Sequence, residues 1–241
     1  MQDLSFEQEV SFNGVDLSPW LLVTDVGRSI APGLDVTRVE VPGADGCLIS
    51  SARLSPLEVT VTACITRRAM ADVSEARRAL AAALSTRVPA PLRLPDEAET
   101  YLMAVYEGGA RPDRLMQCPD VQLTFLCPDP VAFGQRRAEE VAASGMLRPG
   151  GTYRTYPTVR CRPPKGGSWR VTNAATGEFV EVQADFSGEQ EVVLDMGAQR
   201  CTVNGADWPV GIASDYFALD GETEVRVSGG TATFEWDERW I

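Results

Sequence analysis

Residues 55–65 read SPLEVTVTACI, and this stretch decides the class of fold. Apolar side chains stand at every second position from Leu57 to Ile65, and Glu58 and the threonines fall between them. Successive side chains of a β-strand point to opposite faces, so this alternation predicts a strand with one buried and one polar face. We therefore expect a half-buried sheet in the first part of the chain.

The stretch that follows, residues 72–86, has the pattern of a helix. Asp72 is placed to cap the first turn, and Glu75 stands three residues on, in capping-box position. The sequence SEARRALAAALS is rich in good helix formers, and Pro89 and Pro91 end the helix. One apolar stripe predicts that the helix packs on the sheet: Val73, Ala76, Leu80, Ala83 and Leu84.

Further strands are expected on both sides of these two elements. Asn13-Gly14 is a strong signal for a two-residue hairpin turn near the start of the chain. After the helix, short apolar runs predict strands at 92–94, 101–106 and 120–127. Residues 1–134 are therefore expected to form a mainly β domain with one helix.

The remainder of the chain reads as a linker and a second, all-β domain. Residues 135–152 (QRRAEEVAASGMLRPGGT) lack apolar periodicity and become rich in glycine, which predicts a crossover linker. In residues 153–241, candidate strands recur about every ten residues, a spacing typical of an antiparallel sandwich or jelly roll. The candidate strands are 158–162, 168–172, 178–183, 191–194, 200–203, 216–219, 222–227 and 231–236.

Composition excludes several classes of protein. The chain has 241 residues, is 44% hydrophobic and 23% charged, and has no apolar run near the roughly 20 residues of a membrane span. Its first residues lack the basic start and apolar stretch of a signal peptide, so we expect folding in a cytoplasm. The net charge of −12 disfavours binding to nucleic acid through its phosphates.

Nothing in the sequence predicts catalysis, a cofactor or a metal. The absence of histidine excludes Ser-His-Asp and Cys-His machinery, and there is no phosphate-binding glycine motif. The carboxylates mostly alternate with apolar residues, as on the solvated face of a sheet, rather than forming a glycosidase pair. The six cysteines form no CxxC pair, and Cys64 and Cys201 are expected to be small buried thiols, with a disulfide or metal role as the alternative.

The aromatic residues of the second domain suggest an alternative function. Trp169 and Tyr216 lie in strand patterns and are expected in the core. Trp208 lies in the turn-like GADWPVG and is the best candidate for an exposed contact with a glycan. A carbohydrate-binding sandwich for host surface glycans is therefore the alternative to an assembly module.

Several segments, taken in order, resemble the siphophage distal tail protein family over nearly the whole chain. They include FNGVDLSPWLLVTDV (12–26), VEVPGADGCL (39–48), LRLPDEAETYLMAVYEG (92–108), LTFLCPDPVAFG (123–134) and, in the second domain, TYPTVR, VTNAATGEFVEV, VVLDMGAQRCTVNG, YFALDGETEVRV and TATFEWDERW. The residues that carry the family motifs are Asn13, Gly14, Pro42, Gly43, Asp45, Gly46, Asp129, Pro130 and Gly134.

The motifs have a physical reading of their own. Gly43 and Gly46 bracket a turn that is expected to need positive φ. Asp129 lies between two prolines, which favour a rigid chain reversal at a strand end. The small residues Val131-Ala132 stand where an aromatic is common in the family, which places one local contact in doubt.

The resemblance implies a structural virion protein located at the tail tip and assembled in the host cytoplasm. Members of the family form a ring of six subunits through the N-terminal domain, and a galectin-like sandwich projects outward. One face of the ring meets the tail tube protein, and the other meets the tail-associated protein of the tip. The outer domain holds receptor-binding proteins in some members or touches cell-surface glycans. We expect edge strands of the first domain to close the ring by strand addition.

Overall fold

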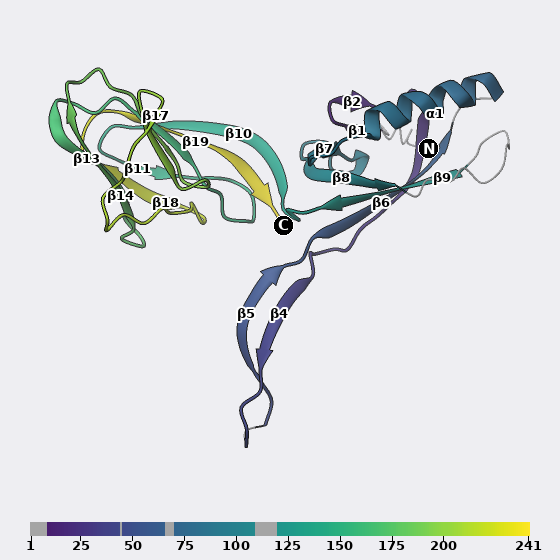
Figure 1. The fold of residues 1–241 in the computed structure, drawn as a ribbon, viewed down its shortest axis with the longest axis horizontal. Helices are drawn as coiled ribbons and strands as arrows, with labels where there is room; N and C mark the ends of the chain where they lie inside the picture. Colours follow the sequence, from purple (N-terminus) through teal and green to yellow (C-terminus); the bar gives the residue numbers. More distant parts are fainter. Residues whose placement is uncertain (1–8, 44, 66–69, 109–119) are drawn as a thin grey trace, which may run out of the picture. The chain divides into compact units, whose positions relative to one another are not determined.

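The computed structural model describes residues 9–43, 45–65, 70–108 and 120–241 (Figure 1). These residues form two compact units, Met1–Ala132 with Ile241 and Phe133–Trp240. The predicted class, mainly β with one helix followed by an all-β sandwich, is confirmed. No helix in the described part of the chain is long and apolar enough to cross a membrane.

The first unit is built on a seven-stranded antiparallel sheet of order β2-β1-β7-β8-β9-β6-β3. The stretch that predicted the sheet is β6, which pairs with β9 without a break from Leu57↔Cys127 to Cys64↔Asp120. Its apolar face is buried as expected, with Val59, Val61 and Ala63 fully shielded. The strands are β1 Ser11–Phe12, β2 Val15–Asp16, β3 Leu21–Gly27, β6 Leu57–Ile65, β7 Ala90–Arg93, β8 Leu102–Gly108 and β9 Asp120–Cys127.

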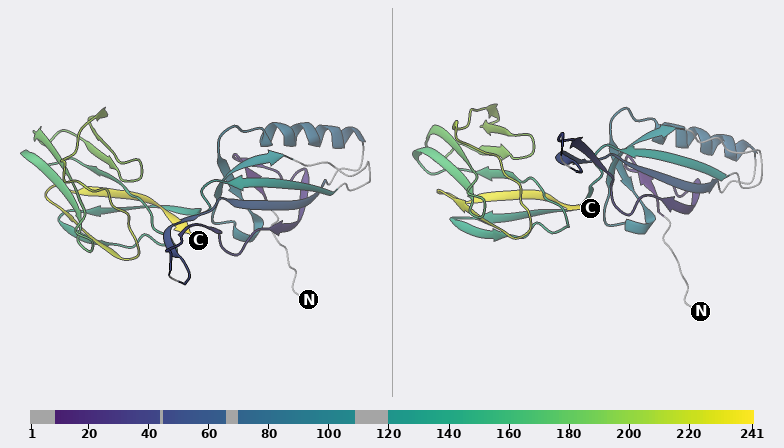
Figure 2. Two further views of the ribbon diagram at one scale, coloured as in Figure 1. Left: turned by 60° about the horizontal axis from the view of Figure 1, so that its bottom comes forward. Right: turned by 90° about the horizontal axis from the view of Figure 1, so that it is seen from below.

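The helix α1, Met70–Leu84, lies along one face of this sheet (Figure 2). The predicted cap is wrong, because the helix begins at Met70 and Asp72 therefore lies inside its first turn. The predicted packing stripe is confirmed at the positions described, since Ala76, Leu80, Ala83 and Leu84 are buried in the core of the unit.

Aromatic rings concentrate in the middle of this core. The Phe125 ring lies 5.2 Å from the ring of Phe12 and 5.7 Å from that of Tyr106, both tilted. Tilted aromatic pairs contribute about 0.5–1.5 kcal/mol each beyond the area they bury. The short 3-10 helix η1, Pro95–Glu97, connects β7 to β8 at the surface of the unit.

A two-stranded hairpin extends from the sheet without joining it (Figure 1). Its strands are β4, Leu34–Val39, and β5, Leu48–Leu54, which pair antiparallel with each other. We call residues 28–56 the arm. No described residue of the arm belongs to the buried core of the unit, so pairing within the hairpin, rather than burial, defines this element.

The second unit is an antiparallel sandwich of two sheets. One sheet has the order β10-β19-β12-β15-β16-β17, and the other has the order β11-β18-β13-β14. Apolar side chains from both sheets, among them Trp169 and Phe234, form one buried core together with Phe217 from a connecting segment. The strands are β10 Ala132–Val141, β11 Ser144–Leu147, β12 Thr158–Cys161, β13 Gly166–Asn173, β14 Phe179–Phe186, β15 Val192–Asp195, β16 Arg200–Val203, β17 Ala206–Asp207, β18 Thr223–Val227 and β19 Ala232–Trp240.

The structure corrects two predictions in this unit. Residues 135–152 are not a linker: most of them form β10 and β11, one strand in each sheet. Side chains 135–140 are exposed on both faces of β10, so the strand has no apolar alternation for sequence reasoning to find. Residues 216–219 form only an isolated bridge, Thr155↔Leu219, instead of the predicted strand.

Candidate functional site

The first family motif forms a tight hairpin turn. Asn13 and Gly14 have φ angles of 52° and 74° and join β1 to β2 as a two-residue loop. Positive φ at both central residues is the requirement of the turn type that Asn-Gly favours, so the predicted turn is confirmed. The flanking Phe12 is fully buried, which fixes the turn at the edge of the core.

The second motif lies at the tip of the arm. Pro42, Gly43, Asp45 and Gly46 are all exposed in the connection between β4 and β5. Gly43 and Gly46 have φ angles of 82° and 86°, which confirms the expected need for positive φ. Among the described residues, and apart from the chain neighbours, no atom lies within 4 Å of the position that a Cβ would take at either glycine. Backbone conformation, rather than lack of space, therefore favours glycine at the tip.

The arm presents apolar side chains to solvent. Val39 and Leu48 are cross-strand partners near the tip and are 47% and 62% exposed. Exposed apolar side chains gathered on one element commonly mark a protein contact. The exposed large apolar residues of the arm are Ile30, Leu34, Val39, Val41, Leu48 and Ile49.

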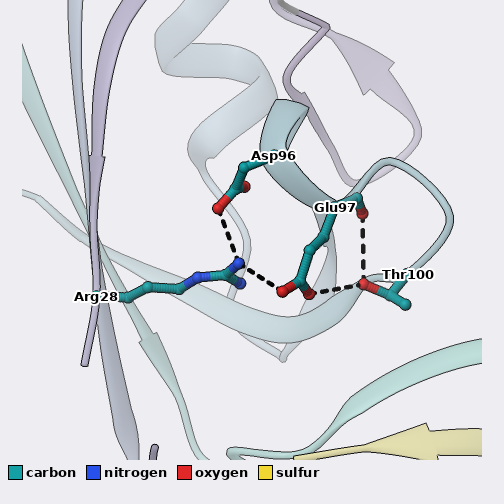
Figure 3. A network of polar contacts seen from close by, with 4 residues as sticks. All are labelled: Arg28, Asp96, Glu97 and Thr100. Carbon is teal, nitrogen blue, oxygen red and sulfur yellow. Dashed lines mark hydrogen bonds and ion pairs between the residues drawn. The ribbon is translucent and has the colours of Figure 1, made fainter. Parts of the chain in front are cut away.

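A cation holds the root of the arm against the sheet unit (Figure 3). Arg28 directly follows β3, and its Nη2 lies 2.8 Å from both Asp96 Oδ2 and Glu97 Oε1 of η1. The Thr100 hydroxyl donates to Glu97 Oε2 at 3.2 Å. The sequence analysis missed this network, because Arg28 and Asp96 are 68 positions apart and no local pattern relates them.

The third motif spans the division between the two units. The Val131 N–H donates to Asp129 Oδ1 at 3.2 Å, which stabilises a turn directly after β9. Pro130, Val131 and Ala132 are buried, so the small residues found in place of an aromatic are accommodated inside the fold.

Gly134, the last residue of this motif, lies in β10 against β19. A Cβ at Gly134 would lie 2.8 Å from Trp240 Nε1 and 3.0 Å from Glu238 Oε2. Glu238 is nearly buried and its Oε1 accepts a hydrogen bond from Arg137 Nε at 2.8 Å. Close approach of these side chains therefore explains the glycine at this position.

Among the residues that the structure describes, β3 is an edge strand of the seven-stranded sheet and has β6 as its one neighbour, and Leu22 in β3 is 45% exposed. The opposite edge strand, β2, has only two residues. Unpaired backbone groups along a longer edge strand favour addition of another strand, so β3 is the better candidate for such a contact.

Trp208 closes another sheet edge instead of projecting freely. Its indole N–H donates to the Gln183 carbonyl of β14 at 2.9 Å. Backbone N–H groups of Gly211 and Asp215 donate to the carbonyls of Glu181 and Phe179, each at 2.8 Å. Residues 208–215 therefore cover the edge of β14. Trp208 is 40% exposed, but its polar atom is already engaged.

A hollow of about 250 Å³ lies among strands β10, β12 and β19 of the second unit. Tyr156, Thr158 and Asp237 contribute an aromatic ring, a hydroxyl and a carboxylate to its lining. The lining residues Arg136 and Glu235 form an ion pair with a 2.7 Å contact. The hollow thus combines hydrogen-bonding residues with three aromatic ones, Phe133, Tyr156 and Trp236.

The cysteines divide into exposed and buried groups. Cys47 is free and exposed at the arm tip. Burial raises the pKa of the Cys127 thiol to about 12 and the pKa values of the Cys161 and Cys201 thiols to about 11. Cys201 is a buried thiol, as the sequence predicts. Cys64 is disulfide-bonded, so the prediction of a buried thiol at Cys64 is wrong. The described residues contain no cluster of three or more potential metal ligands.

Comparison with protein families and curated proteins gives consistent matches along the chain. A phage tail protein RIFT-related domain matches residues 15–127, and the C-terminal domain of siphovirus-type tail components matches residues 150–240. The distal tail protein of Bacillus phage SPP1 is 26% identical over 203 residues, which cover 81% of this chain and 80% of that protein.

Solved structures share the fold over almost the full length. The crystal structure of SPP1 Dit, described as a paradigm of the hub adsorption apparatus in phages that infect Gram-positive bacteria, has a TM-score of 0.85 at 21% identity. That match covers 97% of this chain and 99% of SPP1 Dit. A chain of the phage P2 baseplate in its calcium-activated conformation has a TM-score of 0.53 at 5% identity and covers 96% of this chain and 97% of its own.

Proposed function

Because this chain belongs to the siphophage distal tail protein family, we propose that it is the structural hub joining the tail tube to the tail-tip complex of a long-tailed phage. The observation that carries the proposal is the succession of two tail-component domains along one chain, with a distal tail protein as the curated relative. We further propose that its role in the virion is non-enzymatic and that its partners are the tail tube protein and the tail-tip protein.

In this proposal the first unit forms a ring of six subunits. Two of its surfaces support such a role: the open edge of β3 and the apolar arm. A strand added at β3 would satisfy backbone groups that face no neighbour in the sheet. When subunits associate, the exposed apolar side chains of the arm would also be buried away from water, which favours association.

Electron microscopy of the purified full-length protein tests the ring. Six-fold rings in negative stain, with the matching mass from light scattering, are expected. Leu22→Arg in β3 and Ile49→Arg in the arm each place a charge on a proposed contact and should abolish rings. Ile212→Arg is the control, because Ile212 is fully exposed in the second unit, outside both surfaces. A monomer at all concentrations, alone and with the tail-tip protein, would refute the ring.

Carbohydrate binding by the second unit is the alternative function. The hollow beside Tyr156 favours it, because sugars are recognised through an aromatic face together with mixed hydrogen-bond donors and acceptors. Trp208 favours it less, since its N–H is bound to Gln183. On a glycan array, Tyr156→Ala should remove a signal from the hollow and Trp208→Phe should preserve it. An array without signal would leave the second unit with a role in protein contacts.

A further inference from the structure

The root of the arm is a point where the hairpin ladder is interrupted. Pairing of β3 with β6 ends at Gly27↔Thr60, and pairing of β4 with β5 begins at Leu34↔Leu54. The two connecting segments, 28–33 and 55–56, share a backbone hydrogen bond from the Ser55 N–H to the Gly33 carbonyl at 2.8 Å. Each segment contains a proline, Pro32 or Pro56, which has no N–H to donate. Rotation of the arm about this root is therefore resisted by few backbone contacts.

The Arg28 network lies directly at this root. Arg28 is the first residue after β3, and its side chain is 21% exposed. The two carboxylates that hold it belong to η1, which is itself fixed by backbone hydrogen bonds from Glu97 N–H to the Leu94 carbonyl and from Thr100 N–H to the Glu97 carbonyl. Leu94 is buried in the core of the unit. A cation at the start of the arm thus meets anions on a segment anchored in the core (Figure 3).

We infer that Arg28 is a positioning residue, a latch that fixes the direction in which the arm leaves the sheet. The two ion pairs bias the arm toward a single orientation, so the apolar side chains of the arm are held ready for a partner. The importance of this orientation for assembly rests on the proposed hub function. The latch itself is a property of the single subunit.

Cys47 provides a probe of the latch, because it is a free, exposed thiol at the arm tip. A dye attached there, with single labelling verified by mass spectrometry, reports nanosecond motion of the arm through its fluorescence anisotropy decay. The variants are Arg28→Gln and the double change Asp96→Asn with Glu97→Gln, each of which removes the attraction from one side. Arg53→Gln is the matched control, since it removes an arginine from β5 within the arm itself.

Loss of the latch should increase the mobile fraction of the arm about five- to tenfold, because the attraction of two partly exposed ion pairs is removed. Arg28→Gln and the double variant should agree, Arg28→Lys should fall between them and the wild type, and Arg53→Gln should match the wild type. Added salt should mobilise the wild-type arm and leave Arg28→Gln unchanged, because screening acts on the same attraction. A merely structural contact at η1 would not give this salt dependence.

The inference would be overturned if the arm of Arg28→Gln were no more mobile than that of the wild type, or if added salt changed the mobility of the arm equally in the two proteins. If circular dichroism showed that Arg28→Gln does not fold, the double variant and Arg28→Lys would test the latch instead, because both keep a positive charge at position 28. Ring formation is scored separately by electron microscopy. If the wild-type protein forms rings but Arg28→Gln leaves the mobility of the arm unchanged, the latch alone is refuted. If Arg28→Gln mobilises the arm but the wild-type protein never forms rings, the hub alone is refuted.

Discussion

Replacement of Gly151 by alanine should damage the second unit far more than the same change at Gly177. The two glycines have nearly equal φ angles, 77° and 79°. A Cβ at Gly151 would collide with the backbone oxygen of Arg239, whereas among the described residues, apart from the chain neighbours, no atom lies within 4 Å of a Cβ at Gly177. The pair therefore separates the cost of the backbone conformation from the cost of the collision.

The magnitude follows from the bonds that the collision would break. Thr152 N–H and Tyr153 N–H both donate to the Arg239 carbonyl, at 2.9 and 3.0 Å. A positive φ costs a non-glycine residue about 1–2 kcal/mol, and each lost hydrogen bond costs about 0.5–1.5 kcal/mol. We expect Gly177→Ala to lower the free energy of unfolding by about 1–2 kcal/mol and Gly151→Ala by about 2–5 kcal/mol.

Urea unfolding followed by tryptophan fluorescence measures both effects. Trp236 is buried and its indole N–H donates to the Pro149 carbonyl at 2.9 Å, so it reports on the region next to Gly151. Equal losses in the two variants, within about 0.5 kcal/mol, would refute the reasoning, because they would mean that β19 moves aside without cost.

Four further predictions concern the edge cover, the core and the thiols. Trp208→Phe should lower the free energy of unfolding by about 0.5–1.5 kcal/mol through loss of the bond to Gln183, and Trp240→Phe, equally exposed, should have a smaller effect in the same urea assay. Phe125→Ala should cost about 3–5 kcal/mol in the first unit, and a loss under about 1 kcal/mol would contradict the described core. Unfolded thiols ionise from about pH 8.5 and the buried ones at higher pH, so the free energy of unfolding should fall as pH rises above that value. A thiol reagent at pH 8 should modify Cys47 and, before unfolding, spare the buried free thiols Cys127, Cys161 and Cys201, as mass spectrometry of the digested protein would show.

Sequence patterns predict the elements that have one buried face. The strands β6 and β9 were predicted because their apolar residues alternate, and the structure buries those positions. The strand β10 was missed because residues 135–140 are exposed on both faces. The arm was missed for the same reason, since its strands gain no burial that would separate them from loops.

The candidate site was predictable where it depends on backbone conformation. Asn13-Gly14, Gly43 and Gly46 were identified because positive φ restricts the residue type. The Arg28 network and the edge cover at Trp208 depend on segments far apart in sequence, so no local pattern indicates them. The resemblance to a family predicted the assembly role, which the residues alone did not.

The edges of the sheets differ in how well they are protected against pairing with a strand of another chain. In the second unit, residues 208–215 cover β14, and β10 carries the exposed charged residues Arg136, Arg137, Glu139 and Glu140, which oppose the addition of a foreign strand. In the described part of the first unit, β3 is an edge strand without such a cover. Covered or charged edges resist pairing with a foreign strand, so they lower the risk that this β-rich protein grows into sheets or fibres.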